Sequence, residues 1–400
     1  MYTPKQKIAV IGSVGVPAKY GGFETLVHHL VLNLGTEFDL NVYCSGKTYP
    51  VEERMTNWEG AQLHYIPLKA NGIQSILYDL WSMIKALKTC DKLLVLGVSG
   101  CLFLPFIKLF TDKTVIVNID GLEWRRPKWN WLAKRFLLLS ERIACTFADE
   151  VITDNHMIKE YAKIRYGVEG RLIEYGADHV FPVTPEEEDV KRYAFLKENY
   201  AFKVARIEPE NNVHMILEAF AALPNQPLVI VGNWANSSYG RSLKKAYQTK
   251  ENITLLDPIY NERELNLLRS NAHFYVHGHS AGGTNPSLVE AMYLGLPVLT
   301  YDVIYNRVST NNQAIFYSTA EDLYKLIRQI DRQPLAMVAH NLKSYADRKY
   351  TWKYISNCYG NLFAGNKRMT PRLDEEFEVM PLRHQPAVLP QKARSVEPVI

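Results

Sequence analysis

The sequence has few cysteines, and their arrangement excludes two kinds of site. The five cysteines are odd in number and far apart in the 400-residue chain: Cys44, Cys90, Cys101, Cys145 and Cys358. None forms a CxxC pair, so neither a zinc site nor a disulfide framework is predicted. Free thiols are typical of a reducing compartment, and we expect the protein to be cytoplasmic.

Long apolar runs are also scarce. The most apolar stretch, Leu93 to Phe110, is interrupted by Gly97, Gly100 and Pro105 and falls short of the roughly 20 residues that cross a bilayer. We interpret it as a buried strand, a turn and a short helix, with a membrane-dipping segment as the alternative. The four-residue apolar run before Gly12 is not typical of a signal peptide.

The sequence also lacks a large excess of positive or negative charge. Lys and Arg number 46 and Asp and Glu 42, and this net charge of +4 is too weak by itself to indicate nucleic-acid binding. No metal ligand or cofactor is predicted. A chain of 400 residues is about the right length for two domains.

Strand-like and helix-like segments alternate in two series. The first includes KIAVIGS, FDLNVYC, AQLHYI, KLLVLG, TVIVNID and EVITD, and the second AFKVARI, PLVIVGN, NITLLD, HFYVHG, PVLTYD and AIFYS. Such alternation favours a parallel sheet covered on both faces, so the predicted fold is α/β with two doubly wound, Rossmann-like domains. Ligands of such sheets bind beside the carboxyl ends of the strands, here in the cleft between the domains.

The segment from Phe181 to Tyr193 has two prolines and an acidic run, which indicates an interdomain linker. The alternative for the acidic run is a solvated helix start. We expect domains over 1–182 and 183–350, a helix over 351–366 that packs back toward the first domain, and a disordered tail over 367–400.

The stretch GHSAGGTNPSLVEAMYLG predicts an anion site. A strand ends near Gly278, a loop of small residues follows, and Pro286 lies in the first turn of a helix that contains Glu290. Helix N-termini present free N–H groups and a positive dipole, so they favour phosphate or diphosphate. A carboxylate such as Glu290 can bind sugar hydroxyls; the alternative is a tight turn with a surface glutamate.

Two further segments complete this pattern. Arg206 follows a strand and precedes an amphipathic helix, where it can bind a diphosphate or, alternatively, form a surface ion pair. In the first domain, Gly12 and Gly15 follow a strand, and Gly21 and Gly22 precede a helix. This is not a GxGxxG fingerprint, so nicotinamide binding is only weakly indicated.

These segments resemble the GT-B glycosyltransferases of family 4, through RIEPE after a strand and a glycine loop leading to EAM. The first half, through PAKYGGFET, NIDGLEWRRPKW, ITDNHMIKEY and IEYGAD, resembles the bacterial rhamnosyltransferase-type branch that builds surface polysaccharides. The resemblance spans about Lys7 to Phe363. It implies sugar transfer from a nucleotide sugar, which is a substrate and not a cofactor, to a saccharide or lipid-linked acceptor, with retention and without a metal.

The resemblance also assigns residues. The donor side would comprise Gly21, Gly22, Arg206, Asn211, Asn212, Gly282, Gly283, Thr284, Asn285 and Glu290. Asp120 and Arg206 would be the catalytic residues, with Asp120 or Glu123 orienting the acceptor. The acceptor side would comprise Lys19, Tyr20, Glu123, Trp124 and Arg125.

Two positions depart from the family pattern. Asn211 stands where relatives usually carry a lysine, and Gly282 stands where they tend to carry a glutamate. A glycine there frees space beside the transferred sugar, which favours rhamnose from dTDP-rhamnose. The alternatives are a hexosyltransferase that uses a UDP- or GDP-sugar and, in another class, a non-catalytic sensor or partner that binds nucleotide sugars.

A basic segment with tryptophans follows Glu123. Six basic residues lie between Arg125 and Arg142 against one acid, with Trp124, Trp129 and Trp131 close by. Such a segment favours a peripheral position on an anionic membrane surface. The alternative is an exposed helix with one packed aromatic side.

Overall fold

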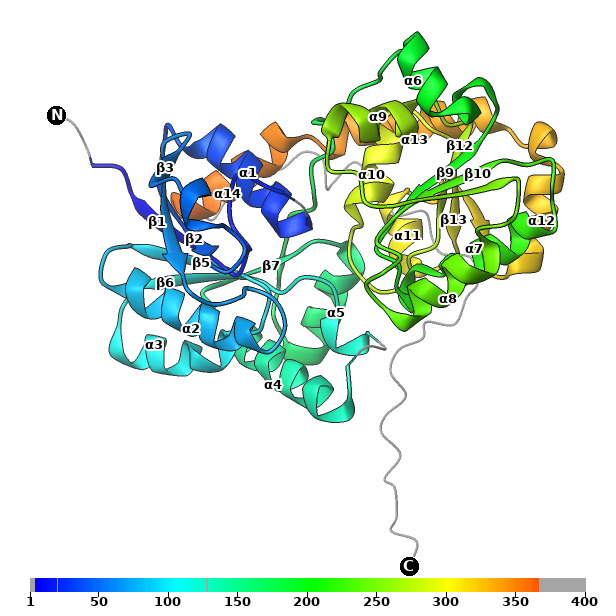
Figure 1. Ribbon diagram of the computed structural model, residues 1–400. Helices are drawn as coiled ribbons and strands as arrows, with labels where there is room; N and C mark the ends of the chain where they lie inside the picture. Colours follow the sequence, from blue (N-terminus) through cyan, green and yellow to red (C-terminus); the bar gives the residue numbers. More distant parts are fainter. Residues whose placement is uncertain (1–3, 20, 127–128, 367–400) are drawn as a thin grey trace, which may run out of the picture.

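Two α/β units follow one another along the chain, as the computed structural model shows (Figure 1). The structure describes residues 4–19, 21–126 and 129–366. The tail over 367–400, for which disorder is predicted, lies outside these residues. The predicted α/β fold with two Rossmann-like domains is confirmed.

The first sheet has eight strands in the order β3-β4-β2-β1-β5-β6-β7-β8. They are β1 (Lys7–Ile11), β2 (Asp39–Ser45), β3 (Asn57–Trp58), β4 (Ala61–Ile66), β5 (Lys92–Leu96), β6 (Thr114–Asn118), β7 (Glu150–Thr153) and β8 (Arg171–Leu172). All neighbours pair in parallel except β3, which runs antiparallel to β4. Both faces are buried, which explains apolar runs such as KIAVI.

Successive side chains of each strand enter different cores because a strand alternates faces. Ile8 and Val10 join the core beneath α1 (Gly22–Leu34), whereas Ala9 and Ile11 join the opposite core. That opposite face is covered by α2 (Gln74–Leu87), α3 (Leu104–Phe110), α4 (Trp131–Phe147) and α5 (His156–Tyr166).

The apolar stretch from Leu93 to Phe110 forms most of β5, a turn and α3, as predicted. Among the residues that the structure describes, no helix has both the length and the apolar character needed to cross a membrane.

The second sheet has six parallel strands in the order β11-β10-β9-β12-β13-β14. They are β9 (Ala201–Val204), β10 (Leu228–Val231), β11 (Ile253–Leu256), β12 (Phe274–His277), β13 (Val298–Tyr301) and β14 (Ile315–Tyr317). Its helices are α7 (Val213–Ala221), α8 (Ser238–Tyr247), α9 (Glu262–Ser270), α10 (Pro286–Tyr293), α11 (Ile304–Ser309), α12 (Ala320–Arg328) and α13 (Leu335–Lys349).

The segment between the two series contains a short helix, α6 (Glu187–Arg192). Glu186 and Asp189 form a capping box at its start, and Arg263 on α9 bonds to both carboxylates. The acidic run is therefore a helix start, which was the alternative interpretation.

The last described helix, α14 (Trp352–Phe363), packs beside α1 on the first domain (Figure 1). Trp352 stacks on His29 of α1 with ring centroids 4.3 Å apart, and Lys92 Nζ donates to the carbonyl of Phe363 at 2.6 Å. The chain thus crosses between the domains twice, which fixes the carboxyl ends of the two sheets near each other.

Candidate active site

Two helix N-termini face each other across the cleft. Gly21 is the N-cap of α1, and α10 begins at Pro286. A Cβ atom added to Gly22 would lie 3.6 Å from Pro286 Cγ, so the two helix starts are in close apposition. Their dipoles and free N–H groups both favour an anion at this position.

The glycine loop before α10 also contacts the first domain closely. A Cβ on Gly121 would lie only 2.4 Å from the carbonyl oxygen of Gly282. Gly283 has φ +95°, and a side chain there would strike Asp154. Small residues are therefore required at this contact, whichever ligand binds.

Thr284 and Asn285 have roles other than the predicted donor contacts. The Thr284 N–H donates to Asp154 Oδ2 at 3.1 Å, so it bridges the domains and is not free for phosphate. Asn285 caps α10, because its Oδ1 accepts from the N–H of Ser287. Asn285, and not Thr284, is therefore the N-cap of α10.

Arg206 lies just beyond β9, and its side chain is exposed. Among the described residues, no carboxylate lies within ion-pairing distance of its guanidinium, so the alternative of a surface ion pair is not observed. The pKa of His279 is lowered to about 3, mainly by burial and in part by the charge of Arg206. Arg206 is thus a cation free to meet an anionic ligand in the cleft.

Asn211 and Asn212, predicted as donor-binding residues, instead hold the loop that carries Arg206. The Asn211 amide donates to the Arg206 carbonyl at 2.9 Å and contacts His279 Nδ1 at 3.1 Å. The Asn212 amide donates to the Gly278 carbonyl at 2.8 Å. These bonds position Arg206 beside the glycine loop, and they leave Asn211 buried.

The loop after β6 supplies charged groups from the first domain. Asp120 has φ +58°, an unfavourable conformation for a residue with a side chain, and such strain is concentrated at functional sites. Glu123 pairs with Arg126 Nε at 2.7 Å and accepts from Trp129 Nε1 at 3.1 Å. Glu123, predicted to orient an acceptor, is thus already held by two donors.

Two carboxyl groups approach each other at the domain contact. Burial, and then the charge of Asp120, raise the pKa of Asp154 well above its usual range. Burial is also the main cause of the raised pKa of Asp120, although the charge of Arg126 opposes it. The charge of Asp120 therefore disfavours ionisation of Asp154.

Glu290 on α10 is held by two cations or potential cations. Its carboxylate pairs with Arg269 at 2.8 Å and with His179 Nε2 at 3.3 Å. Burial alone would raise the pKa of Glu290, but Arg269 and His179 together outweigh burial and lower the pKa to about 2. Glu290, which is predicted to bind sugar hydroxyls of the donor, is therefore an ionised carboxylate in a fixed position.

The predicted acceptor side is only partly brought together. Lys19 pairs with Glu53 at 2.5 Å, and Tyr20 lies outside the described residues. Arg125 stacks on Trp124 at 5.2 Å. It also lines a cavity of about 260 Å³ between the domains, together with Pro209, Glu210, Ser280, Ala281, Gly282 and Tyr305.

Sequence reasoning missed three residues of this cleft: Arg126, Asp154 and Glu210. Arg126 lies near several acids: burial would lower its pKa, but Glu123, Asp120, Glu210 and Glu208 raise it. Asp154 directly follows a strand, a signal that could have been used. Glu210 and Arg126 come from different domains, and their proximity has no local signal.

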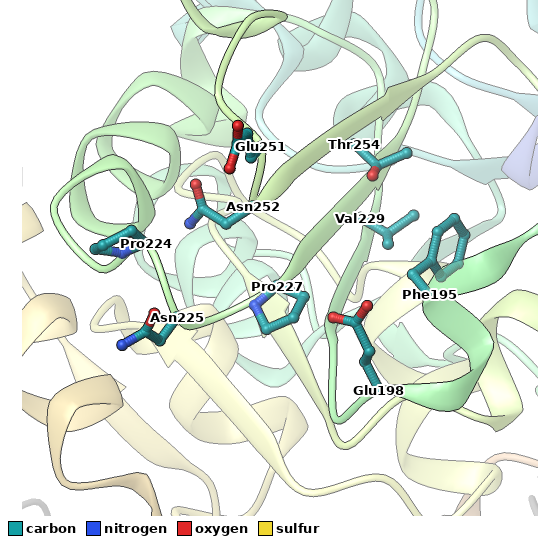
Figure 2. Close-up of a pocket in the computed structure, with 9 residues that line it drawn as sticks. All are labelled: Phe195, Glu198, Pro224, Asn225, Pro227, Val229, Glu251, Asn252 and Thr254. Atoms are coloured by element: carbon teal, nitrogen blue, oxygen red, sulfur yellow. The ribbon is translucent and has the colours of Figure 1, made fainter.

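A second cavity lies away from this cleft. About 220 Å³ in volume, it is bounded by Glu251, Asn252 and Pro227 at the amino ends of β10 and β11 (Figure 2). Ligands of parallel sheets bind at the carboxyl ends, so this cavity is not the candidate site.

Each half of the chain matches one family model. Residues 5–178 match "Domain of unknown function (DUF1972)", and residues 185–349 match "Glycosyl transferases group 1". Comparison with curated protein sequences gives no match.

Solved structures show the same fold at low sequence identity. Sucrose-phosphate synthase from Thermosynechococcus elongatus matches with a TM-score of 0.75 at 18% identity, over 90% of this chain and 99% of that one. Anabaena HepE in complex with UDP-glucose matches with a TM-score of 0.69 at 14% identity, over 90% and 99%. WaaG, a glycosyltransferase involved in lipopolysaccharide biosynthesis, matches with a TM-score of 0.63 at 15% identity, over 90% and 99%.

The two facing sheets, with the cleft between their carboxyl ends, are those of the GT-B fold. With the glycosyl transferases group 1 domain over residues 185–349, the protein is a glycosyltransferase.

Proposed function

We propose that this glycosyltransferase moves rhamnose from dTDP-rhamnose to a saccharide or lipid-linked acceptor in surface polysaccharide biosynthesis. The observation that carries a nucleotide-sugar donor is the apposition of the α1 and α10 N-termini beside the free cation of Arg206. Two dipoles and a guanidinium suit a diphosphate. The structural neighbour HepE in complex with UDP-glucose supports the same class of donor.

The reaction proposed needs no metal, because positive charge is already present on both sides of the diphosphate. The bond from the sugar C1 to the phosphate oxygen breaks as the bond from C1 to the acceptor oxygen forms on the same face. The acceptor proton passes to the departing phosphate, whose charge Arg206 and the helix N-termini stabilise. In this proposal Asp120 orients the acceptor hydroxyl and forms no covalent bond.

Two features support a deoxyhexose on a deoxyribonucleotide. Gly282 lines the interdomain cavity and has no side chain, so this position supplies no carboxylate to the transferred sugar. Glu290 already bonds Arg269 and His179, so it has less need of a ribose 2′-hydroxyl. The second candidate is a UDP-sugar, which the UDP-glucose complex of HepE favours.

The donor is tested by thermal shift against dTDP-rhamnose, UDP-glucose, UDP-galactose and GDP-mannose. A ligand at about 100 times its Kd adds roughly 2.7 kcal/mol of stability. We expect dTDP-rhamnose to give the largest rise in Tm, by a few degrees. Stabilisation by a UDP- or GDP-sugar that is also turned over, with no effect of dTDP-rhamnose, would remove the rhamnosyl assignment and leave the glycosyltransferase.

We also propose that the acceptor lies at an anionic membrane surface. Large apolar side chains on the outer faces of α2, α3 and α4 are exposed, and they form what we call the three-helix apolar surface: Leu77, Trp81, Ile84, Phe106, Leu109, Phe110, Trp131, Leu132 and Leu139. The three helices lie on the same side of the first sheet (Figure 1). Exposed Lys85, Lys88, Arg135 and Arg142 add positive charge, which suits anionic lipid.

A further inference from the structure

One buried acid in the cleft has no protein donor for its carboxylate oxygens. Glu210 is only 4% exposed, and neither oxygen accepts a hydrogen bond from an N–H or hydroxyl group of the described residues. Burial, and then a hydrogen-bonding contact with the neighbouring carboxyl of Glu208, raise the pKa of Glu210. A buried polar group without a partner costs about 1–3 kcal/mol, and more when it is charged, so a bound ligand that supplies donors would recover this cost.

The backbone around Glu210 is fixed, so the position of its side chain is not accidental. The N–H and the hydroxyl of Ser280 both donate to the Glu210 carbonyl, at 2.8 and 3.0 Å. This pair of bonds ties the start of the glycine loop to the turn that follows Arg206. Glu210 therefore lies between the cation proposed for the diphosphate and the loop that contains Gly282.

The space beside Glu210 fits a sugar ring. Glu210 and Gly282 line the same interdomain cavity of about 260 Å³. Arg126, from the first domain, faces Glu210 closely enough for its charge to oppose the rise in the Glu210 pKa. A group transferred from a diphosphate held by Arg206 and the helix N-termini must occupy the space next to them.

We infer that Glu210 recognises the hydroxyl groups of the transferred sugar and so determines donor specificity. The inference rests on the proposed nucleotide-sugar donor. Sugar hydroxyls donate to a carboxylate, and a site built for such bonds discriminates strongly against ligands that lack the hydroxyls. Glycine at position 282 leaves Glu210 as the acid from the second domain that lines this cavity.

The test separates recognition of the sugar from recognition of the nucleotide. Calorimetry measures the Kd of dTDP-rhamnose and of dTDP for wild type and Glu210→Gln, with UDP-glucose and UDP as a second pair. Loss of a hydrogen bond to a charged group corresponds to a factor of roughly 10 to 100 in Kd. We expect that loss for the nucleotide sugar and less than about a twofold change for the nucleoside diphosphate, which also shows that the variant is folded.

Glu251→Gln is the matched control, because Glu251 lines the remote cavity of Figure 2. It should change neither Kd. If Glu210→Gln does not fold, Glu210→Asp is used instead, because it keeps the charge but moves the carboxylate away from the ligand by one methylene. The same weaker binding of the nucleotide sugar, with unchanged binding of the nucleoside diphosphate, is expected.

Three results would overturn the inference. Equal losses for nucleotide sugar and nucleoside diphosphate would give Glu210 a structural role. Unchanged Kd values for both would remove it from the donor site, and a change confined to the KM of the acceptor would move it to the acceptor site. If wild type binds the nucleoside diphosphates and no nucleotide sugar, the proposed function itself fails.

Discussion

Glu290 shows how one buried ion pair beside the cleft links stability to pH. Its partner Arg269 is almost fully buried, with a side chain 4% exposed. Against the effect of burial, Arg269 and His179 together hold the pKa of Glu290 at about 2, compared with an ordinary value of 4.5. Because the folded pKa lies below the unfolded one, this stabilisation is present above about pH 4.5 and is lost as the pH falls toward 2.

Glu290→Gln should therefore lower the free energy of unfolding at pH 7 by about 3–5 kcal/mol, because the charge of Arg269 stays buried without its partner. Urea denaturation measures this, and the gap between variant and wild type should narrow from pH 5 to pH 3. Glu169→Gln, which breaks exposed pairs with Lys159 and Lys163, is the control and should cost less than about 1 kcal/mol. Equal stability of wild type and Glu290→Gln at pH 7 would show that the pair contributes nothing.

Single residues also mark the limit of what the sequence could predict about the site. The sequence predicts Arg206 and the glycines before α1 and α10 as residues of the anion site, because each stands between a strand and a helix. That arrangement is a local pattern. The sequence does not predict the roles of Thr284 and Asn211, because they depend on Asp154 and His279, which are distant in sequence. Partners across a domain contact leave no periodic signal.

Among the elements, the long strands and helices follow from the sequence and the shortest do not. Alternation of apolar strands with amphipathic helices predicted the two parallel sheets, since both faces of such sheets are buried. The two-residue strands β3 and β8 are too short to show a period. β8 depends on its pairing with β7, as in the contact of Ile152 with Arg171, whereas β3 forms a local hairpin with β4.

The helices α2 and α4 carry the prediction about the membrane. Lys85/Lys88/Arg135/Arg142→Glu reverses four exposed charges beside the three-helix apolar surface. Each basic residue near an anionic surface contributes roughly 1 kcal/mol, so flotation with phosphatidylglycerol-containing vesicles should be abolished. Wild-type flotation should need the anionic lipid and weaken with salt.

The matched control is Arg241/Lys245/Lys250/Arg328→Glu, which makes the same change in charge with exposed residues of the second domain. It should float like wild type. Equal flotation of both variants, or binding of wild type to neutral vesicles alone, would contradict a membrane-facing role for α2–α4.

At the scale of the whole molecule, the site exists only because the two domains meet. The first contributes Gly22, Asp120 and Arg126, and the second contributes Arg206 and the start of α10. Asp154 bonds across the contact, and α14 returns to the first domain. Neither sheet alone has positive charge on both sides of a bound diphosphate, which is what the proposed transfer requires.

The most direct test is the release of dTDP from dTDP-rhamnose by wild type and Arg206→Ala, measured side by side in the presence of EDTA. Arg206 is exposed and outside the core, so the variant should keep the Tm of wild type. The account predicts metal-independent turnover by wild type. It also predicts a loss of at least about 100-fold in kcat/KM for Arg206→Ala, because one charge-stabilising group is removed. Turnover of Arg206→Ala at the wild-type rate, or no turnover of any nucleotide sugar by wild type, would contradict it.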